Sequence, residues 1–580
     1  MRISLVPSVL TPAEAADPCA APLGVLALVG ILEKSGITCS IVEGNDCLID
    51  CRPDAFSNGL DRLADQIVAT QPDIVGFSAM CSSLPVAVLV ARRVRDRLLR
   101  TPIVFGGPQA TVVARDLLKA FAFIDAVFQG EAELGVVAFV RAVSSGKRLD
   151  RMPSVTFRDG VSIVQTPAGP ILSDLDRLEF PRLANVASRW NGQLPIEAGR
   201  GCPFRCDFCS TSLFWSHRFR LKSAGRILDE MLYCRKHYNT RRFHLVHDLF
   251  TADRERVRLF CRHILRSRSD LEWTCSARVD TIDTSLIQLM RSAGCVQIYF
   301  GVETGSQRLQ RVIRKNLVLS RLPEIASEVT RAGIRGIYSF ITGFPDETYD
   351  DVEETLRMIR WLADVPNTET QCHCLSLLPG TRLFETHGDS IVFDPKWTDA
   401  VLPVVGSEMR ELIASHPRLF SAYFRLANTR VSIEALRRVP AMARAIGCLP
   451  QTLDVARGVL GDSQLCDTLS SWADVALEGQ VEAESLLVHL MRRLVAMGAG
   501  ARGAVDAFVA LASVHLRGRG NGTETVAESG DLVIRNGLVA WRGNGRGIVV
   551  VFSDRNGRIG IIREEGNDQH KTVSSSISLA

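Results

Sequence analysis

Short apolar runs alternate with amphipathic segments over the first 175 residues of the chain. Five of these runs have the length and the branched or aromatic side chains of buried strands, and they lie at 2–8, 39–44, 73–79, 102–107 and 125–131. The segments between them repeat apolar residues at helical spacing. Strands separated by helices are typical of α/β proteins, so we predict a doubly wound, Rossmann-like parallel sheet over residues 1–175.

The alternation continues from 176 to 385 at a pace of about one strand and one helix every 30 residues, which is typical of βαβ units. The runs that read as strands lie at 194–201, 241–248, 271–280, 296–306, 334–345 and 370–380. We therefore predict a partial (β/α)6 barrel of the TIM type. In such a barrel the active site lies at the carboxyl ends of the strands.

The pattern changes after residue 385. Residues 386–517 read as a helical domain, with amphipathic stretches such as 434–446 and 485–499 interrupted by Pro450. A glycine-rich linker at 517–524 follows. The last domain, 524–580, alternates apolar and polar residues around two Asn-Gly pairs, at 536–537 and 556–557, which predicts a small antiparallel β tail built from hairpins.

Composition narrows the class of protein. The 580 residues carry a net charge of +4, with 46% hydrophobic and 23% charged residues, as in an ordinary globular protein. Such a balanced charge predicts neither nucleic acid nor an anionic membrane as a partner. The apolar run at 22–32 is too short to span a bilayer, and it has neither a basic segment in front nor a cleavage site behind, so we predict a buried helix.

The sixteen cysteines are spread over the whole chain rather than packed into a small disulfide scaffold. Most, such as Cys39, Cys234 and Cys261, stand alone among apolar residues, where a thiol behaves as a small hydrophobic group. This usage predicts a reducing cytoplasm. Cys372 and Cys374 flank His373 on a predicted strand; a metal pair is conceivable there, but residues lining the barrel are the favoured interpretation.

Cys202, Cys206 and Cys209 are different, because they crowd three thiols into one glycine- and proline-flanked loop. Structural zinc needs four closed ligands, usually from two Cys-x-x-Cys knuckles, and no second knuckle is present. Three thiolates at the spacing Cys-x-x-x-Cys-x-x-Cys suit a [4Fe-4S] cluster with one iron left open. With Phe208 before the last cysteine, this loop resembles that of the radical S-adenosylmethionine (SAM) enzymes, whose open iron binds the methionyl group of SAM.

The amino-terminal domain carries a second resemblance. "DIVGFSAM" (73–80), "VFGGPQAT" (104–111) and "FQGEAE" (128–133) place glycines and small residues at the carboxyl ends of predicted strands, where a large flat ligand can lie close to the backbone. They resemble the cobalamin-binding domain fused to certain radical SAM enzymes, and the likeness covers residues 1–385. Two departures stand out, since no histidine precedes His217 and Gln109 stands where relatives often have histidine. Cobalt without a histidine ligand from this domain is implied.

The resemblance also implies site residues, all at strand ends or in adjoining loops. For SAM they are Phe208, Asp248, Ser276, Arg278, Glu303 and Gly343. For cobalamin they are Ser78, Gly106, Gly107, Gln109, Gly130 and Glu131. The alternative for each is a turn or a helix cap, as for "DET" (346–348) in front of a helix near Tyr349.

Individual roles at SAM follow from the same resemblance. Asp248 is expected at the ammonium group, because a buried cation needs an anion. Arg278 and Ser276 are expected at the carboxylate and the ribose. Glu303 is placed for the ribose or the amino group, and Gly343 is expected to let the backbone approach the adenine.

Four functions fit this sequence. The favoured one is a cobalamin-dependent radical methyltransferase that acts on an unactivated carbon of a small-molecule or peptide natural product. The second uses the same cofactors for cyclisation or another rearrangement. A methylthiotransferase would need a second cluster, but Cys19, Cys39, Cys47, Cys51 and Cys81 lack a three-ligand spacing. The fourth is a cobalamin sensor, which the intact cysteine loop disfavours. Radical chemistry of this kind also implies an electron donor of the flavodoxin or ferredoxin type.

Overall fold

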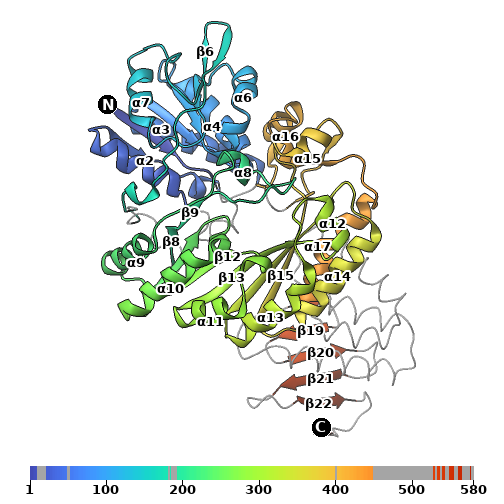
Figure 1. Cartoon of the computed structure of the whole chain (residues 1–580). Coiled ribbons are helices and arrows are strands. Elements are labelled where there is room, and N and C mark those ends of the chain that lie inside the picture. Colours follow the sequence, from blue (N-terminus) through green and yellow to red (C-terminus); the bar gives the residue numbers. More distant parts are fainter. Residues whose placement is uncertain are drawn as a thin grey trace. The chain divides into compact units, whose positions relative to one another are not determined.

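A computed structural model describes residues 1–9, 21–48, 52–180, 183, 193–398 and 401–448, together with strands between 527 and 576. The chain divides into two compact units, and Figure 1 labels their helices and strands. The first comprises Met1–Asp351 and His373–Val431, and the second comprises Val352–Cys372 and Ser432–Ala580. The predicted boundaries at 175 and 385 do not coincide with the limits of these units. Pro450, the stretch 485–499 and the linker at 517–524 lie outside the described residues.

The first unit opens with a seven-stranded sheet of order β2-β1-β3-β4-β5-β6-β7. Its strands are β1 (Arg2–Val6), β2 (Thr38–Ile41), β3 (Ile74–Ser78), β4 (Ile103–Gly106), β5 (Ala126–Phe128), β6 (Val155–Asp159) and β7 (Ser162–Gln165). The five predicted strands pair in parallel, which confirms the doubly wound sheet. The antiparallel edge formed by β6 and β7 was not predicted.

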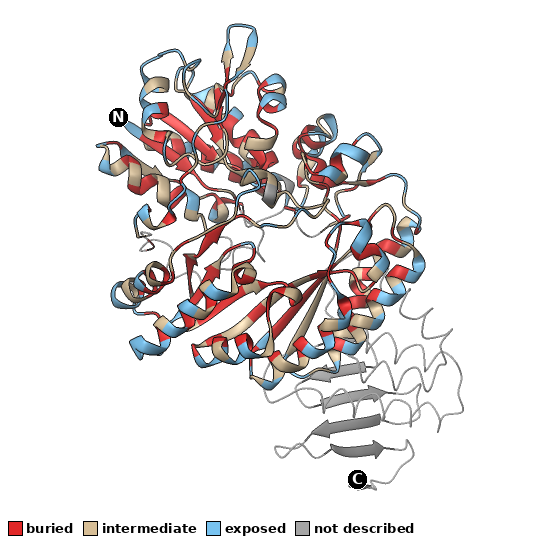
Figure 2. Ribbon diagram, in the orientation of Figure 1, coloured by how far each residue is buried: buried red, intermediate tan, exposed pale blue. Residues whose placement is uncertain are grey.

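Alternation along the strands gives this sheet a core on each face. In β4, Ile103 and Phe105 belong to one apolar cluster and Val104 to the other, because successive side chains point to opposite faces. Both faces are covered, so the strands are buried almost throughout (Figure 2). The covering helices are α2 (Leu23–Lys34), α3 (Pro53–Ala69), α4 (Leu84–Arg97), α5 (Pro108–Val112), α6 (Ala114–Ala120) and α7 (Val136–Ser144). Helix α2 confirms the buried helix predicted at 22–32.

A six-stranded sheet of order β15-β14-β13-β12-β11-β8 follows. Its strands are β8 (Gln193–Glu197), β11 (Arg242–Val246), β12 (Glu272–Ala277), β13 (Cys295–Glu303), β14 (Arg335–Thr342) and β15 (Thr368–Cys374). Neighbours from β8 to β14 pair in parallel, as predicted. The intervening helices are α8 (Thr211–Phe214), α9 (Ala224–Tyr238), α10 (Arg254–Ser267), α11 (Thr284–Ser292), α12 (Gln307–Val312), α13 (Leu322–Arg331) and α14 (Tyr349–Ala363).

The segment after this sheet is not a separate helical domain up to Val431. It contains α15 (Arg382–His387), an antiparallel pair of β16 (Ile391–Phe393) with β17 (Phe424–Leu426), and α16 (Gly406–Ser415). Apolar residues between 401 and 424 join the core of the first sheet on the face of α3 and α4. The hydroxyl of Tyr423 donates to the carbonyl of Ser82 at 2.7 Å. Burial of these side chains explains why the first unit extends past residue 385.

The second unit contains helix α17 (Ile433–Cys448) and an antiparallel sheet of order β18-β19-β20-β21-β22-β23. Its strands are β18 (Ala527–Ser529), β19 (Leu532–Arg535), β20 (Leu538–Arg542), β21 (Ile548–Ser553), β22 (Ile559–Glu564) and β23 (Ser575–Ser576). Arg535 pairs with Leu538 and Ser553 with Ile559, so both predicted Asn-Gly pairs fall between paired strands. The antiparallel β tail is confirmed. Among the described residues, no helix is long and apolar enough to cross a bilayer.

Candidate active site

The cysteine loop begins at a two-stranded ribbon after β8. In it β9 (Gly199–Arg200) pairs antiparallel with β10 (Arg220–Leu221), and Arg200 lies opposite Arg220. Gly201 follows with φ +84°, and a Cβ atom there would lie 1.9 Å from the carbonyl oxygen of Arg218. Only glycine fits this turn. Cys202 comes next, so the ribbon and the turn set where the first thiol lies.

The loop backbone is held from two sides. The amide of Asp207 donates to the carbonyl of Ile313 at 3.0 Å, and the amide of Leu383 donates to the carbonyl of Asp207 at 2.9 Å. The ring of Phe208 packs edge-on against Phe344, with ring centroids 5.6 Å apart. Phe208 is therefore a packing residue that fixes the end of the loop, and no described contact assigns it to SAM.

Cys202, Cys206 and Cys209 are free, half-buried thiols close enough to interact electrostatically. The pKa of Cys202 is raised to about 11, mostly by burial and to a smaller extent by the neighbouring thiolates of Cys209 and Cys206. Burial also raises the pKa of Cys206, while Lys315 and Arg278 oppose the rise. Three thiols with cations beside them suit a cluster that binds thiolates and carries negative charge.

A single metal ion is the alternative occupant of this loop. Among the described residues, no group of three or more His, Cys, Asp or Glu side chains is arranged to hold one. A cubane cluster does not need ligands that converge on one ion, since each thiolate binds a different iron. The loop therefore fits the cluster.

Asp248 and Ser276 lie at neighbouring strand ends beside this loop. Asp248 accepts hydrogen bonds from the amide of Gly201 at 3.2 Å and from the hydroxyl of Thr211 at 3.1 Å. Desolvation by the surrounding protein raises the pKa of the Asp248 carboxyl, although its side chain is exposed; the two hydrogen bonds oppose the rise. Asp248 thus braces the turn in front of Cys202. Ser276 is half-buried at the end of β12.

Arg278 and Glu303 are both engaged by protein groups. Arg278 is buried, forms two hydrogen bonds with Asp280 at 2.9 and 2.8 Å, and stacks 3.8 Å from the ring centroid of Phe204 inside the cysteine loop. Glu303 has φ +71° at an irregularity in β13, a strained conformation for a residue other than glycine. Its carboxylate pairs with the buried Lys315 at 2.6 Å. Arg278 and Lys315 are the two cations that face Cys206.

The surroundings of Gly343 differ from the expectation. Its amide donates to Glu347 at 2.5 Å, and a Cβ atom there would lie 2.7 Å from the indole ring of Trp397. The space that this glycine leaves open on its Cβ side is filled by Trp397, and the approach of an adenine to its backbone stays a prediction. Burial raises the pKa of Glu347 to about 7, and the amide of Gly343 and the hydroxyl of Thr342 oppose the rise. The helix cap in "DET" is Thr348, which exchanges hydrogen bonds with Asp351.

Four of the predicted cobalamin residues gather at the carboxyl edge of the first sheet. Ser78 pairs with Gly106 at the ends of β3 and β4. Gly107 has φ +92°, and a Cβ atom there would lie 2.9 Å from the amide nitrogen of Ala79. Gly130 has φ +70° with no atom within 4 Å of the position of its Cβ. This small-residue edge fits a flat ligand lying close to the backbone, and the four contacts remain predictions.

Gln109 and Glu131 lie at the same edge, and their side chains bind other parts of the protein. The side-chain amide of Gln109 is buried and donates to the carbonyl of Leu419 at 3.1 Å. Glu131 accepts hydrogen bonds from both Arg200 and Arg220, and its side chain is 4% exposed. The cobalamin contacts predicted for these two residues stay predictions, and their tertiary contacts favour structural roles instead.

The remaining cysteine hypotheses gain no support. Cys19 and Cys51 lie outside the described residues. Cys39 is half-buried and Cys47 is buried, and burial raises the pKa of both thiols. Cys372 and Cys374 take part in no metal group among the residues that the structure describes.

Residues 196–359 match the family model of the radical SAM superfamily, and residues 13–140 match that of the B12 binding domain. An uncharacterized methyltransferase of Pyrococcus horikoshii is 30% identical over 328 residues, which are 56% of this chain and 71% of the relative. An anaerobic magnesium-protoporphyrin IX monomethyl ester cyclase of Rubrivivax gelatinosus is 28% identical over 425 residues, 70% of this chain and 73% of the relative.

A solved structure shows the same fold. It is the radical S-adenosylmethionine methyltransferase TsrM from Kitasatospora setae with cobalamin and a [4Fe-4S] cluster bound, at a TM-score of 0.61 and 17% identity, covering 82% of this chain and 99% of that chain. The chain belongs to the cobalamin-binding radical SAM enzymes. Its cofactors are a [4Fe-4S] cluster, SAM and cobalamin.

Sequence reasoning missed four charged residues at this site. Arg200 and Arg220 bind Glu131, Lys315 pairs with Glu303, and Glu347 lies behind Gly343. Arg200 had a usable signal, since it stands directly before the Gly-Cys turn. Glu347 stands in the same stretch of sequence as Gly343. Arg220 and Lys315 lie outside the motifs that they support, and only tertiary packing brings them there.

Replacing Cys202, Cys206 and Cys209 together by alanine should abolish the cluster. The protein reconstituted without oxygen should hold about four iron and four sulfide per chain, and the triple variant close to none. Replacing Cys39, Cys47 and Cys81 by alanine is the matched control and should leave both contents unchanged. Iron and sulfide that persist in the first variant would show that the ligands are misassigned.

Gln109→Leu should lower the free energy of unfolding by about 1–3 kcal/mol, because it leaves the buried carbonyl of Leu419 without its donor. Cobalamin affinity should not change. Urea titration of the apoprotein and a binding titration with hydroxocobalamin measure the two quantities. Unchanged stability together with a large loss of affinity would return Gln109 to the cobalamin site.

Proposed function

We propose that this enzyme transfers a methyl group from SAM, by way of cobalamin, to an unactivated carbon of a small-molecule or peptide natural product. The observation that carries the proposal is the joining of a complete three-cysteine loop and a cobalamin-type sheet edge in one compact unit. Relatives named as methyltransferases, one at 30% identity and one at the level of fold, support it.

When bound, the cluster supplies the electron that cleaves SAM and cobalamin carries the methyl group. The chain supplies position and charge. Cys202, Cys206 and Cys209 hold the cluster, and the buried cations Arg278 and Lys315 offset its negative charge. Asp248 keeps the turn at Gly201 in place through the amide.

Contacts to SAM are proposed from the same strand ends. Ser276 is half-buried with its hydroxyl at the end of β12. Glu303 is paired with Lys315, and Arg278 is bound to Asp280 and to the carbonyl of Lys315. A SAM ribose or carboxylate would share these groups with those partners. A shared site of this kind exchanges one ion pair for another when SAM binds, which limits the desolvation cost.

Contacts to cobalamin are proposed at Ser78, Gly106, Gly107 and Gly130. With no histidine before His217, the first sheet offers no imidazole to cobalt. Cobalamin bound at this edge would carry the methyl group without an imidazole from this domain.

An electron donor must reach the cysteine loop from outside. Arg205 is exposed within the loop, and Arg314 and Arg382 lie 3.5 and 3.8 Å from Asp207 with 47% and 65% of their side chains exposed. A cavity of about 180 Å³ lies beside Asp207 and Phe208. We propose this basic face as the binding surface for an acidic donor of the flavodoxin or ferredoxin type, since electron-transfer contacts rely on charge steering. The reducing cytoplasm remains a prediction.

The second candidate is cyclisation or another rearrangement with the same cofactors. The relative named as a cyclase favours it, at 28% identity over 73% of its length. Both reactions would use the same cysteine loop, so only their products separate them.

The products of SAM distinguish the two candidates. Methyl transfer should release S-adenosylhomocysteine and 5′-deoxyadenosine in roughly equal amounts per product, because one SAM gives the methyl group and another the radical. A deuterated methyl group on SAM should appear in the product. Chromatography with mass spectrometry, on anaerobic reactions with candidate substrates, measures both.

Two outcomes would contradict the proposal. If 5′-deoxyadenosine forms with product while S-adenosylhomocysteine and label transfer are absent, the enzyme is a rearrangement catalyst. If only S-adenosylhomocysteine forms while the methyl group is still transferred, the radical step is wrong.

A further inference from the structure

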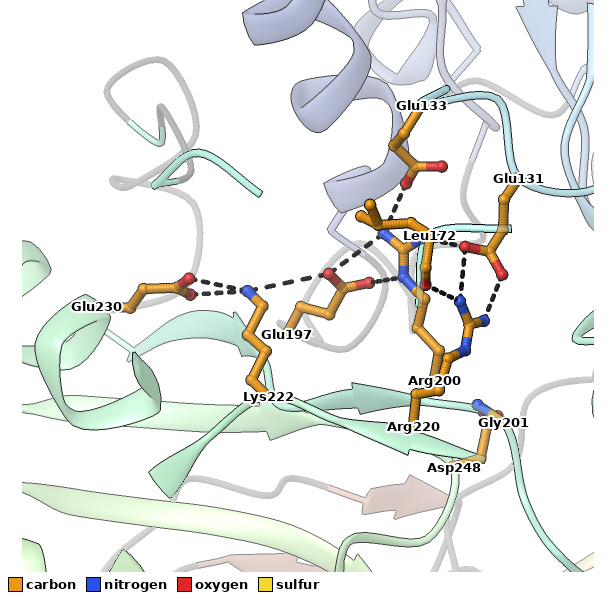
Figure 3. A network of polar contacts seen from close by, with 10 residues as sticks. All are labelled: Glu131, Glu133, Leu172, Glu197, Arg200, Gly201, Arg220, Lys222, Glu230 and Asp248. Atoms are coloured by element: carbon orange, nitrogen blue, oxygen red, sulfur yellow. Dashed lines mark hydrogen bonds and ion pairs between the residues drawn. The ribbon is translucent and has the colours of Figure 1, made fainter. Parts of the chain in front are cut away.

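A buried ion network joins the edge of the first sheet to the start of the cysteine loop (Figure 3). Arg200 and Arg220 are direct cross-strand partners in the β9–β10 ribbon, so their side chains share one face of it. Both reach Glu131, which stands three residues after the end of β5. The side chains of Arg200, Arg220 and Glu131 are only 4%, 10% and 4% exposed.

Hydrogen bonds and ion pairs engage most of the polar side-chain atoms of Arg200, Arg220 and Glu131. Arg200 donates to Glu131 at 3.0 Å and to Glu197 at 2.7 Å, and it lies 2.6 Å from Glu133. Arg220 donates to one oxygen of Glu131 at 3.0 Å and to the other oxygen through its second nitrogen. Because guanidinium groups are planar and rigid, a carboxylate held by two of them is fixed in direction as well as in distance.

The network continues into the second sheet and balances its charge. Lys222, which follows the ribbon, lies 3.9 Å from Glu197 and 2.8 Å from the fully buried Glu230. Four carboxylates (Glu131, Glu133, Glu197 and Glu230) therefore face four cations (Arg200, Arg220, Lys222 and Arg226). Burial disfavours the charged guanidinium, but Glu197 and Glu133 raise the pKa of Arg200, so it stays ionised.

Arg200 and Glu131, at the two ends of this ion network, each stand next to residues of the candidate site. Arg200 directly precedes Gly201, whose amide Asp248 holds, and Cys202 follows. On the other side Glu131 directly follows Gly130, the glycine with open space beside it. One residue thus separates Arg200 from the first cluster ligand, and none separates Glu131 from the small-residue edge.

We propose that Glu131, Arg200 and Arg220 are positioning residues that hold the cobalamin edge at a fixed place relative to the cysteine loop. The two cofactors are bound by separate sheets, and a reaction that uses both needs a constant separation between them. An apolar contact can slide, whereas a forked carboxylate–guanidinium contact is directional. Burying balanced charges adds little net stability over an apolar contact, so geometry is the better reason for this network.

The proposal rests on the presence of both cofactors, which family membership gives, and not on which reaction they perform. Its test therefore needs no turnover. Pulsed dipolar electron paramagnetic resonance on frozen holoprotein, with cob(II)alamin and the one-electron-reduced cluster, measures the distribution of cobalt-to-cluster distances. The wild type should give one narrow distribution.

Glu131→Gln is the test variant and Glu230→Gln its matched control. Each removes one buried carboxylate charge from the same network. Of the two, Glu131 joins the first sheet to the ribbon, whereas Glu230 pairs only with Lys222 and Arg226 on its own side of the network. Glu131→Gln should broaden or shift the distance distribution while the iron and cobalamin contents stay at wild-type levels. Glu230→Gln should lower thermal stability and leave the distances unchanged. In turnover, product formed per 5′-deoxyadenosine should fall by about tenfold in Glu131→Gln alone, as expected for misplaced reactants.

A narrow, unshifted distribution in Glu131→Gln would overturn the proposal and leave the network a stabilising one. The same conclusion would follow if Glu230→Gln broadened the distances equally. If Glu131→Gln does not fold, the distance distribution is measured in Arg220→Lys instead. This variant keeps the positive charge but loses the pair of hydrogen bonds to the two oxygens of Glu131. If the products instead show rearrangement while the distances behave as expected, the proposed function fails and the positioning role stands.

Discussion

The guanidinium of Arg200 is buried between the two parallel sheets of the first unit. A buried charge is tolerated only where other charges and hydrogen bonds replace water. Three glutamates meet this need, from the β5 loop of the first sheet and from the end of β8 in the second. All three of these contacts form together only when both loops are in place. The position of the cysteine loop, which starts at the next residue, therefore depends on the presence of the first sheet.

Electrostatics around the thiols follow the same logic at shorter range. Lys315 and Arg278 face Cys206, and each is paired with a carboxylate, Glu303 or Asp280. These pairs keep the pocket near neutrality, so that the charge of three thiolates and a cluster meets cations that are already fixed in position. The strained backbone of Glu303 is consistent with this use, since strain is retained where the surroundings determine a conformation.

The sequence predicted both parallel sheets and the presence of an iron–sulfur cluster, because buried strands and a three-cysteine loop leave local signals. It did not predict the roles of Gln109, Glu131 and Gly343. Each stands in a motif that indicates a cofactor, but each is engaged by a residue distant in the chain, respectively Leu419, Arg200 and Trp397. The same reason explains the missed extension of the first unit, since the side chains at 401–424 show their partner only when they pack against α3 and α4.

Hydrogen–deuterium exchange, followed by mass spectrometry, tests most directly whether the two halves are held as one. Peptides covering 126–133 and 197–203 should both exchange slowly in the wild-type protein, because their backbones are held by the sheets and by the same buried ions. In Glu131→Gln we expect both peptides to exchange faster together, while peptides from β13 stay unchanged. Faster exchange at 126–133 alone, with 197–203 unaffected, would contradict the account, since the cysteine loop would then keep its place without the first sheet.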